Sequence, residues 1–137
     1  MLNTTLEKNR KFIVDIRAEK LFREAEDDFF YFGKINDAIE KLEKALMFSP
    51  QMIKALLMRA NIDVIEGELE SALGFYLLAE TYSPDNVKVL AGLANIYEMK
   101  GQNDKALEYK KNIVIDIMKR YANIDVNPDI IYDNNIY

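Results

Sequence analysis

The sequence predicts an all-α protein that consists of three helix-turn-helix units stacked side by side. The main observation is a shared period of 34 residues in three residue types. The glycines are Gly33, Gly67 and Gly101, the alanines are Ala38, Ala72 and Ala106, and the prolines are Pro50 and Pro84. A fixed period of this length is typical of stacked-repeat architectures. Each unit would be a helical hairpin that buries its apolar face only against its neighbours.

Length and composition exclude several classes of protein. With 137 residues, half of them hydrophobic, the chain can form one domain with a single core. The net charge of −5 argues against a nucleic-acid binder, which would need a basic surface. The chain has no Cys and no His, so it lacks thiolate ligands, the commonest transition-metal ligand and the usual general base. We therefore expect a non-catalytic protein without a cofactor or metal.

The sequence shows neither an apolar segment of a signal sequence nor one of a transmembrane helix. Residues 1–8 contain no continuous apolar segment of the kind that a signal sequence needs. No uninterrupted apolar run approaches the 18 or so residues of a transmembrane helix. We therefore expect a cytoplasmic protein that does not enter a membrane.

Residues 1–18 are expected to form a helical extension before the first unit. Residues 5–18 contain neither Pro nor Gly, and their apolar side chains give an irregular face. These side chains are Leu6, Phe12, Ile13 and Ile16. The segment would either continue into the first helix of the first unit or kink near Ala18.

The three units are expected at 19–52, 53–86 and 87–120, and the second shows the plan most clearly. Its first helix is expected from Ile53 to Glu66. Gly67 follows, because glycine adopts the left-handed conformation that ends a helix at little cost. The second helix ends at Ser83, because Pro84 disfavours helical geometry in the residue before it. The third unit lacks this proline, so its second helix should continue past residue 118, to Tyr121 or Ala122.

The repeated alanines are expected where the two helices of each hairpin touch. Two antiparallel helices at short distance need small side chains at their contact. A larger side chain at Ala38 or Ala72 would therefore overpack the interface.

These features resemble the tetratricopeptide repeat family over residues 19–120. The resemblance implies a right-handed superhelix of three helical hairpins that binds other proteins. The family's early tryptophan is replaced by Phe22, Leu56 and Leu90, while its small and aromatic positions match Ala60, Ala94, Phe29 and Tyr97. The departures are Glu26, Asp63, Lys110, Ile113 and Met118. For Asp63 the spacing from Arg59 allows an ion pair along one helix face, whereas Glu26 suggests a local shift in packing.

The resemblance also implies which residues line the concave groove. Among the first-helix positions that face the groove in this family, the candidate peptide-binding residues are Lys20, Arg23, Lys54, Leu57, Met58, Asn61, Val64, Ile65, Lys88, Asn95 and Met99. The asparagine amides could bind a peptide main chain, over an apolar floor that includes the adaptable Met58. The lysines would favour a carboxylate or an acidic stretch. A dedicated clamp for a chaperone tail is not expected, because Asp27, Met58 and Gly92 replace residues which that clamp requires.

We therefore expect an adaptor that binds a protein or peptide partner, and the sequence leaves two alternatives open. The second helix of the third unit carries Ile113, Val114, Ile117 and Met118 with no obvious helix after it. This end could form a homodimer, because repeat arrays need polar terminal caps to stay monomeric. A small secretion chaperone is a further alternative, by analogy of fold alone.

Residues 121–137 comprise the end of the last helix and a tail without repeats. From residue 123 the helical period is lost, and the tail holds Asp125, Asp129 and Asp133 but no Lys or Arg. Its many apolar residues predict that it docks on a repeat surface. Covering the end of the third unit is favoured over the groove, because the short connection raises the effective concentration there.

Overall fold

The protein is an array of six α-helices that ends in one π-helical turn, as seen in a computed structural model that describes residues 2–122. Every regular element in this range is helical, which confirms the all-α prediction. The elements are α1 Leu2–Phe30, α2 Ile35–Phe48, α3 Ile53–Ile65, α4 Leu69–Tyr82, α5 Val87–Met99, α6 Asn103–Ile117 and the π-helical turn η1 Met118–Ala122. The predicted docking of residues 123–137 lies outside the described residues.

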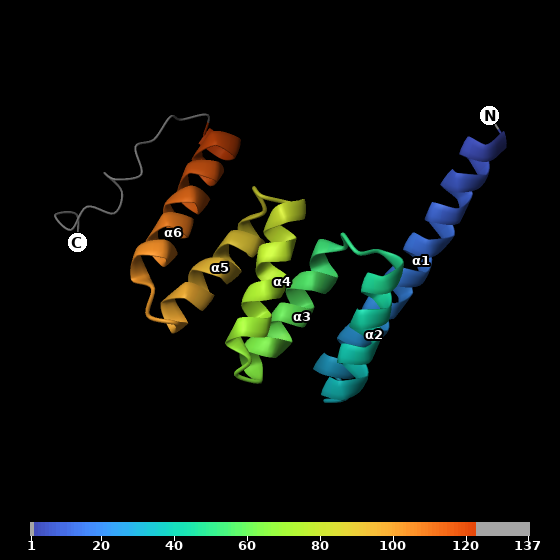
Figure 1. Ribbon diagram of the computed structural model, residues 1–137, viewed down its shortest axis with the longest axis horizontal. Helices are drawn as coiled ribbons and strands as arrows, with labels where there is room; N and C mark the ends of the chain where they lie inside the picture. Colours follow the sequence, from blue (N-terminus) through green and yellow to red (C-terminus); the bar gives the residue numbers. More distant parts are fainter. Residues whose placement is uncertain (1, 123–137) are drawn as a thin grey trace.

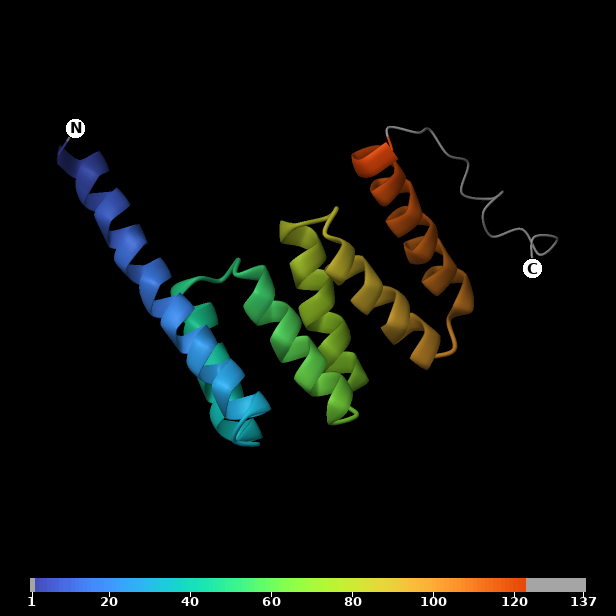
Figure 2. The same cartoon turned by 180° about the vertical axis from the view of Figure 1, so that it is seen from behind.

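The helices pack in chain order as three antiparallel hairpins. Helices α1 and α2, α3 and α4, and α5 and α6 form the pairs, and the pairs stand in a row (Figures 1 and 2). Contacts of α2 with α3 and of α4 with α5 join one hairpin to the next. The middle hairpin, α3 with α4, therefore buries residues on two sides, as expected for stacked units.

The three glycines close the hairpin turns as predicted. Gly33, Gly67 and Gly101 have φ angles of 64°, 81° and 76°, in the left-handed region that glycine adopts without strain. The residue after each glycine donates its N–H to a main-chain carbonyl near the end of the preceding helix. These bonds are Lys34 N to Asp28 O at 2.7 Å, Glu68 N to Asp63 O at 2.8 Å and Gln102 N to Tyr97 O at 2.8 Å. The bonds of the second and third hairpins span five residues, as in the Schellman closure, whereas the bond of the first hairpin spans six.

The other helix ends also agree with the sequence. Helices α2 and α4 end one residue before Ser49 and Ser83, which precede the prolines. The last helix has no proline and continues through η1 to Ala122, as predicted. At the other end, α1 is a single helix of 29 residues without a break at Ala18. Its first half extends beyond α2 (Figure 1). The exposed apolar side chains of this half are Leu6, Phe12, Ile13 and Ile16.

The repeated alanines are buried at the helix contacts. Ala38, Ala72 and Ala106 are all inaccessible to solvent or nearly so. In α1 the buried small residue is Ala25, whereas Glu26 stays partly exposed. Phe22 and Asp28 are buried as their equivalents Leu56 and Ile62 are, so α1 keeps the register of the repeat, and the charge of Glu26 is accommodated because that position stays in contact with solvent.

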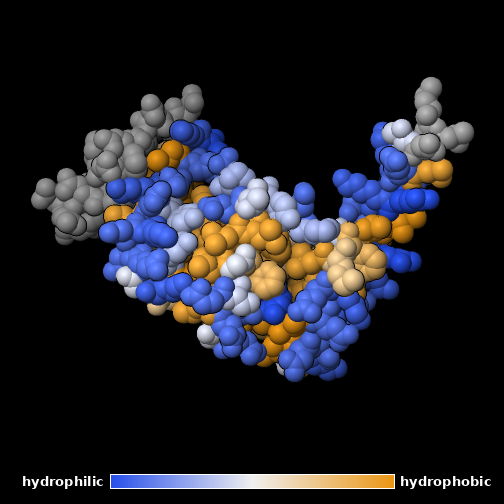
Figure 3. Space-filling view, in the orientation of Figure 1, coloured by the Kyte–Doolittle hydropathy of each residue, from blue (hydrophilic) through white to orange (hydrophobic). Residues whose placement is uncertain are grey.

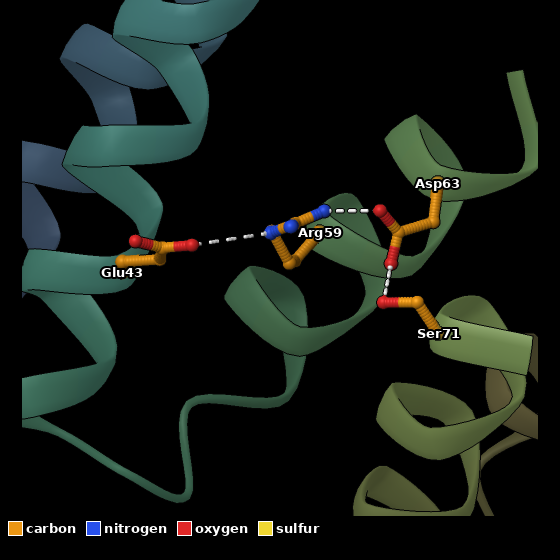
Figure 4. A network of polar contacts seen from close by, with 4 residues as sticks. All are labelled: Glu43, Arg59, Asp63 and Ser71. Atoms are coloured by element: carbon orange, nitrogen blue, oxygen red, sulfur yellow. Dashed lines mark hydrogen bonds and ion pairs between the residues drawn. The ribbon is translucent and has the colours of Figure 1, made fainter. Parts of the chain in front are cut away.

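A buried ion pair explains the acid within the apolar stripe of α3. Asp63 is only 4% exposed, and its carboxylate accepts hydrogen bonds from Arg59 and from the Ser71 hydroxyl, the latter at 2.6 Å (Figure 4). The Nε atom of Arg59 lies 3.8 Å from Glu43 of α2. The guanidinium also lies 5.1 Å from the centre of the Phe75 ring. The expected Arg59–Asp63 pair is confirmed. Through Glu43 of α2 and Ser71 of α4, the network around this pair connects α3 with both neighbouring helices.

None of the helices described between residues 2 and 122 is suited to span a bilayer. Helix α1 is long enough at 29 residues, but charged residues interrupt its apolar positions throughout.

Candidate functional site

The first helices of the three hairpins enclose a groove with a volume of about 630 Å³. Helices α1, α3 and α5 supply all of its lining except one residue of α4. The lining residues are Phe22, Glu26, Phe29, Phe30, Lys54, Leu57, Met58, Asn61, Ile62, Tyr76, Lys88, Ala91, Gly92 and Asn95. Figure 3 shows apolar side chains exposed in the middle of the array, between more hydrophilic ends.

The structure brings six of the candidate peptide-binding residues together in this groove. They are Lys54, Leu57, Met58, Asn61, Lys88 and Asn95. Lys20 and Arg23 are exposed on α1 outside the hollow, and Val64 packs against the core. Ile65 and Met99 are exposed at the last residues of α3 and α5.

Tyr76 is a groove residue that sequence reasoning missed. It belongs to α4, yet its side chain reaches between α3 and α5 and is only 3% exposed. Its hydroxyl donates a hydrogen bond to Oδ1 of Asn61. The amide orientation of Asn61 is thereby set, and its two N–H donors remain for a ligand. Burial also raises the pKa of Tyr76, so the phenol stays a donor.

Gly92 makes this arrangement possible. A β-carbon at Gly92 would lie 2.6 Å from Cζ and 2.7 Å from Cδ1 of Tyr76, closer than atoms can approach. The Tyr76 ring thus occupies the space that a side chain at position 92 would need. A glycine inside a helix is the sequence signal for such a close approach, because glycine otherwise weakens a helix.

Asn95 occupies the position in α5 that Asn61 holds in α3. Its side chain is exposed in the groove, and no hydrogen-bond partner for it occurs among residues 2–122. Both its donors and its acceptor are therefore available. The two asparagines stand one unit apart and could bind successive peptide groups of an extended chain.

The basic groups of the groove lie at the N-terminal ends of α3 and α5, while its one acidic lining residue, Glu26, belongs to α1. Lys54 Nζ lies 2.5 Å from a carboxylate oxygen of Glu19 and 4.8 Å from the centre of the Phe22 ring. Lys88 has no ion pair within the described part of the chain. Both lysines are the second residues of their helices, where the helix dipole is positive. This end of the groove therefore favours anionic groups.

The acidic cluster of α1 is explained by internal pairing. Asp28 is buried, and its carboxylate lies 2.5 Å from Nζ of Lys41 on α2. The hydrogen bond to Asp28 raises the pKa of Lys41. Residues 2–122 contain no group of three or more acidic side chains arranged to hold a metal ion.

The candidate self-association face lies on α6 and η1. Ile113, Val114 and Met118 are half-buried there, and Ile117 is 41% exposed. Among the described residues no further helix packs on this face.

Comparison with known proteins identifies the fold. No protein-family model matches the chain, and no curated protein matches it either. A crystal structure of MamA aligns with 77% of this chain at a TM-score of 0.71 and 22% identity, and it is covered over 61% of its own length. A second MamA structure aligns with 80% of this chain at a TM-score of 0.69 and 21% identity, with 59% of that chain covered. The chain thus spans about three fifths of these neighbours, and it shares with them a tetratricopeptide-like fold.

Proposed function

We propose that this protein is a non-catalytic interaction module that holds an extended segment of a partner protein in the groove between α1, α3 and α5. The observation that carries the proposal is the pair of groove asparagines, Asn61 and Asn95, at equivalent positions of neighbouring hairpins. Asn side chains can donate to and accept from a main chain of any sequence. The repeat spacing therefore provides the same contact twice along one bound chain.

The floor of the groove suits side chains of such a segment. Phe22, Phe29, Leu57 and Met58 contribute apolar surface from α1 and α3. Mostly apolar lining with a few placed polar groups is the usual composition of a binding site. Met58 adds adaptability, because its side chain adjusts to different shapes.

The fold supports the same class of function. Solenoids of helical hairpins create extended concave surfaces that bind proteins. The likeness to MamA gives the fold alone, so the function proposed here depends on the groove residues.

Replacement of Asn95 by alanine tests the proposal. Peptide ligands would first be selected from a random library against the full chain, and their affinities measured by fluorescence anisotropy. We expect Asn95→Ala to weaken binding by about two- to tenfold, the effect of one lost hydrogen bond. Asn36→Ala, at an exposed position of α2, should leave affinity unchanged. Ligands that bind equally well to the Asn95 variant would place the binding surface elsewhere.

Asn61 is less suited to a single test. Asn61→Ala removes the acceptor of the Tyr76 hydroxyl, which would then be left unpaired in a buried position. Such a loss destabilises the fold as well as the site. The double change Asn61→Ala with Lys54→Glu should still weaken binding, but its melting temperature must be compared with that of Tyr76→Phe.

Self-association through the α6 face is a second candidate function, because Ile117 exposes a large apolar side chain there. If this face forms a homodimer, light scattering should show the dimer for the native chain and a monomer for Ile117→Lys. A monomer at all concentrations for the native chain would exclude this function.

A further inference from the structure

Three kinds of side chain form rows across the first helices of the array. Each row repeats with the 34-residue period, and each continues from one hairpin to the next. The basic row is Lys20, Lys54 and Lys88, the amide row is Asn61 and Asn95, and the apolar row is Tyr31, Ile65 and Met99.

The rows are parallel because of the geometry of α3 and α5. In α3, Asn61 follows Lys54 by seven residues and Ile65 follows Asn61 by four, so all three lie within about 40° on one side of the helix. A rise of 1.5 Å per residue separates the basic and amide rows by about 10 Å, and the amide and apolar rows by about 6 Å. In α5, Lys88 and Asn95 line the groove as Lys54 and Asn61 do.

The apolar row is exposed to solvent in all three hairpins. Tyr31, Ile65 and Met99 are 81%, 66% and 50% exposed. Single exposed apolar residues need no explanation, but exposed residues in register along one edge indicate an interaction surface. The row continues the groove past Asn61 and Asn95 by one helical turn.

Two members of the basic row stand at a position that does not stabilise their helices. Lys54 and Lys88 lie in the first turns of α3 and α5, where a lysine opposes the helix dipole, whereas Lys20 lies in the middle of α1. Lys54 is offset by its contact with Glu19, whereas Lys88 has no ion pair within residues 2–122. A cation that recurs at an unfavourable position favours a role in binding anionic groups.

We propose that the partner segment is an extended strand whose side chains alternate between acidic and apolar, and that it lies along the three rows. Successive side chains of a strand point to opposite sides. With the main chain over the amide row, the acidic side chains would meet the basic row and the apolar side chains the apolar row. The gap between the basic and amide rows is wider than the gap between the amide and apolar rows. The wider gap suits an ion pair, because a lysine side chain of the protein and an acidic side chain of the segment both extend into it.

A helical partner fits the rows less well. The main-chain groups of a helix are already bonded to each other, so the amide row would have no partner. An extended segment along the three rows, the strand model, has a contact for every row. It depends on the proposed function, in which the groove binds a peptide.

A probe with the required pattern is present in the sequence itself. Between residues 123 and 130 the polar residues Asn123, Asp125, Asn127 and Asp129 alternate with Ile124, Val126, Pro128 and Ile130. A labelled synthetic peptide of residues 123–130 thus presents a polar edge that carries Asp125 and Asp129, and an apolar edge. Two control peptides have the same length. One carries Lys at the Asp positions, and the other has the same composition with acidic and apolar residues in separate blocks.

Anisotropy titrations with the full chain test the inference. We expect the alternating acidic peptide to bind about tenfold or more tightly than either control. The titrations are repeated on a chain with Asp125→Lys and Asp129→Lys, so that its own segment cannot compete for the groove.

Two variants, each with a matched control, test whether the basic row and the apolar row contact the peptide. Lys88→Glu should weaken the acidic peptide about five- to tenfold and strengthen the lysine peptide, whereas Lys8→Glu, with the same change in net charge, should do neither. Met99→Asp should weaken both alternating peptides, whereas Met47→Asp, at an exposed position of α2, should not.

The outcomes separate this inference from the proposed function. Equal affinity of the block peptide and the alternating peptide, with binding still lost in Asn95→Ala, would overturn the strand model and leave the groove as a peptide site. No binding of any peptide at millimolar concentration, together with failure of the library selection, would overturn both. If the full chain forms a dimer that the alternating peptide dissociates, a second copy supplies the segment, which supports the strand model.

Discussion

Gly92 offers the most direct test of how the groove is built, because its replacement by alanine acts on one contact. The added β-carbon would lie 2.6 Å and 2.7 Å from ring atoms of Tyr76, whereas carbon atoms in contact lie about 3.5–4.0 Å apart. The ring cannot move easily, because Tyr76 is 3% exposed and its hydroxyl is bonded to Asn61. The clash therefore has to be relieved by moving α5 away from α4.

The magnitude follows from two opposing effects. Overpacking of this kind costs about 1–3 kcal/mol, while Gly to Ala inside a helix gains about 1 kcal/mol. Gly74 is the matched control, because it lies inside α4 and a β-carbon there meets nothing within 4 Å. Gly74→Ala should stabilise the protein by about 1 kcal/mol. The difference between the two variants isolates the clash, at about 1–3 kcal/mol.

Thermal denaturation followed by circular dichroism measures this difference. For a chain of this size 1 kcal/mol corresponds to a shift of about 3–4 °C in melting temperature, so Gly92→Ala should melt about 3–12 °C below Gly74→Ala. Tyr76→Leu combined with Gly92→Ala should recover part of the loss, since the two residues are in contact. Equal melting temperatures for the two alanine variants would refute the close packing of Tyr76 against α5.

Three further predictions concern the packing of the hairpins. Ala72→Phe should lose about 1–3 kcal/mol by overpacking the α3–α4 contact, and an unchanged melting curve would contradict the assigned register. Asp63→Ala should cost about 3–5 kcal/mol because it removes the buried partner of Arg59 and leaves the guanidinium only its longer contact with Glu43, whereas Ser71→Ala should cost only about 1 kcal/mol; equal losses in urea denaturation would contradict the network. Burial raises the pKa values of Tyr76 and Tyr109 above the unfolded value of about 10. Their contribution to stability is complete below pH 10 and falls as pH rises above it, so melting temperatures from pH 8 to 12 should fall less steeply in Tyr109→Phe.

The sequence predicted the limits of the helices closely. The expected first helix of the second unit, Ile53 to Glu66, ends within one residue of α3, which is Ile53–Ile65. The predicted continuation of the last helix to Ala122 is also present. Helix ends were predictable because Gly and Pro act through the backbone of their immediate neighbours.

The candidate groove was predicted in part. The repeat period placed Asn61 and Asn95 at equivalent positions, and both line the groove. The period treats every unit alike, however, and α1 has no hairpin before it. Position 26 of α1 is partly exposed and belongs to the groove lining, whereas the equivalent alanines of α3 and α5, Ala60 and Ala94, are buried.

By itself the sequence determined the helical hairpins, their turns and the small residues at their contacts, because these depend on local backbone preferences and on a period read along one chain. Only the tertiary structure decided which side chains meet between hairpins. Tyr76 of α4 bonds to Asn61 of α3 and lies against Gly92 of α5, and Lys54 pairs with Glu19 of α1. Such contacts join residues 15 to 35 positions apart, and they depend on the angle and spacing at which whole helices pack, which no local preference specifies.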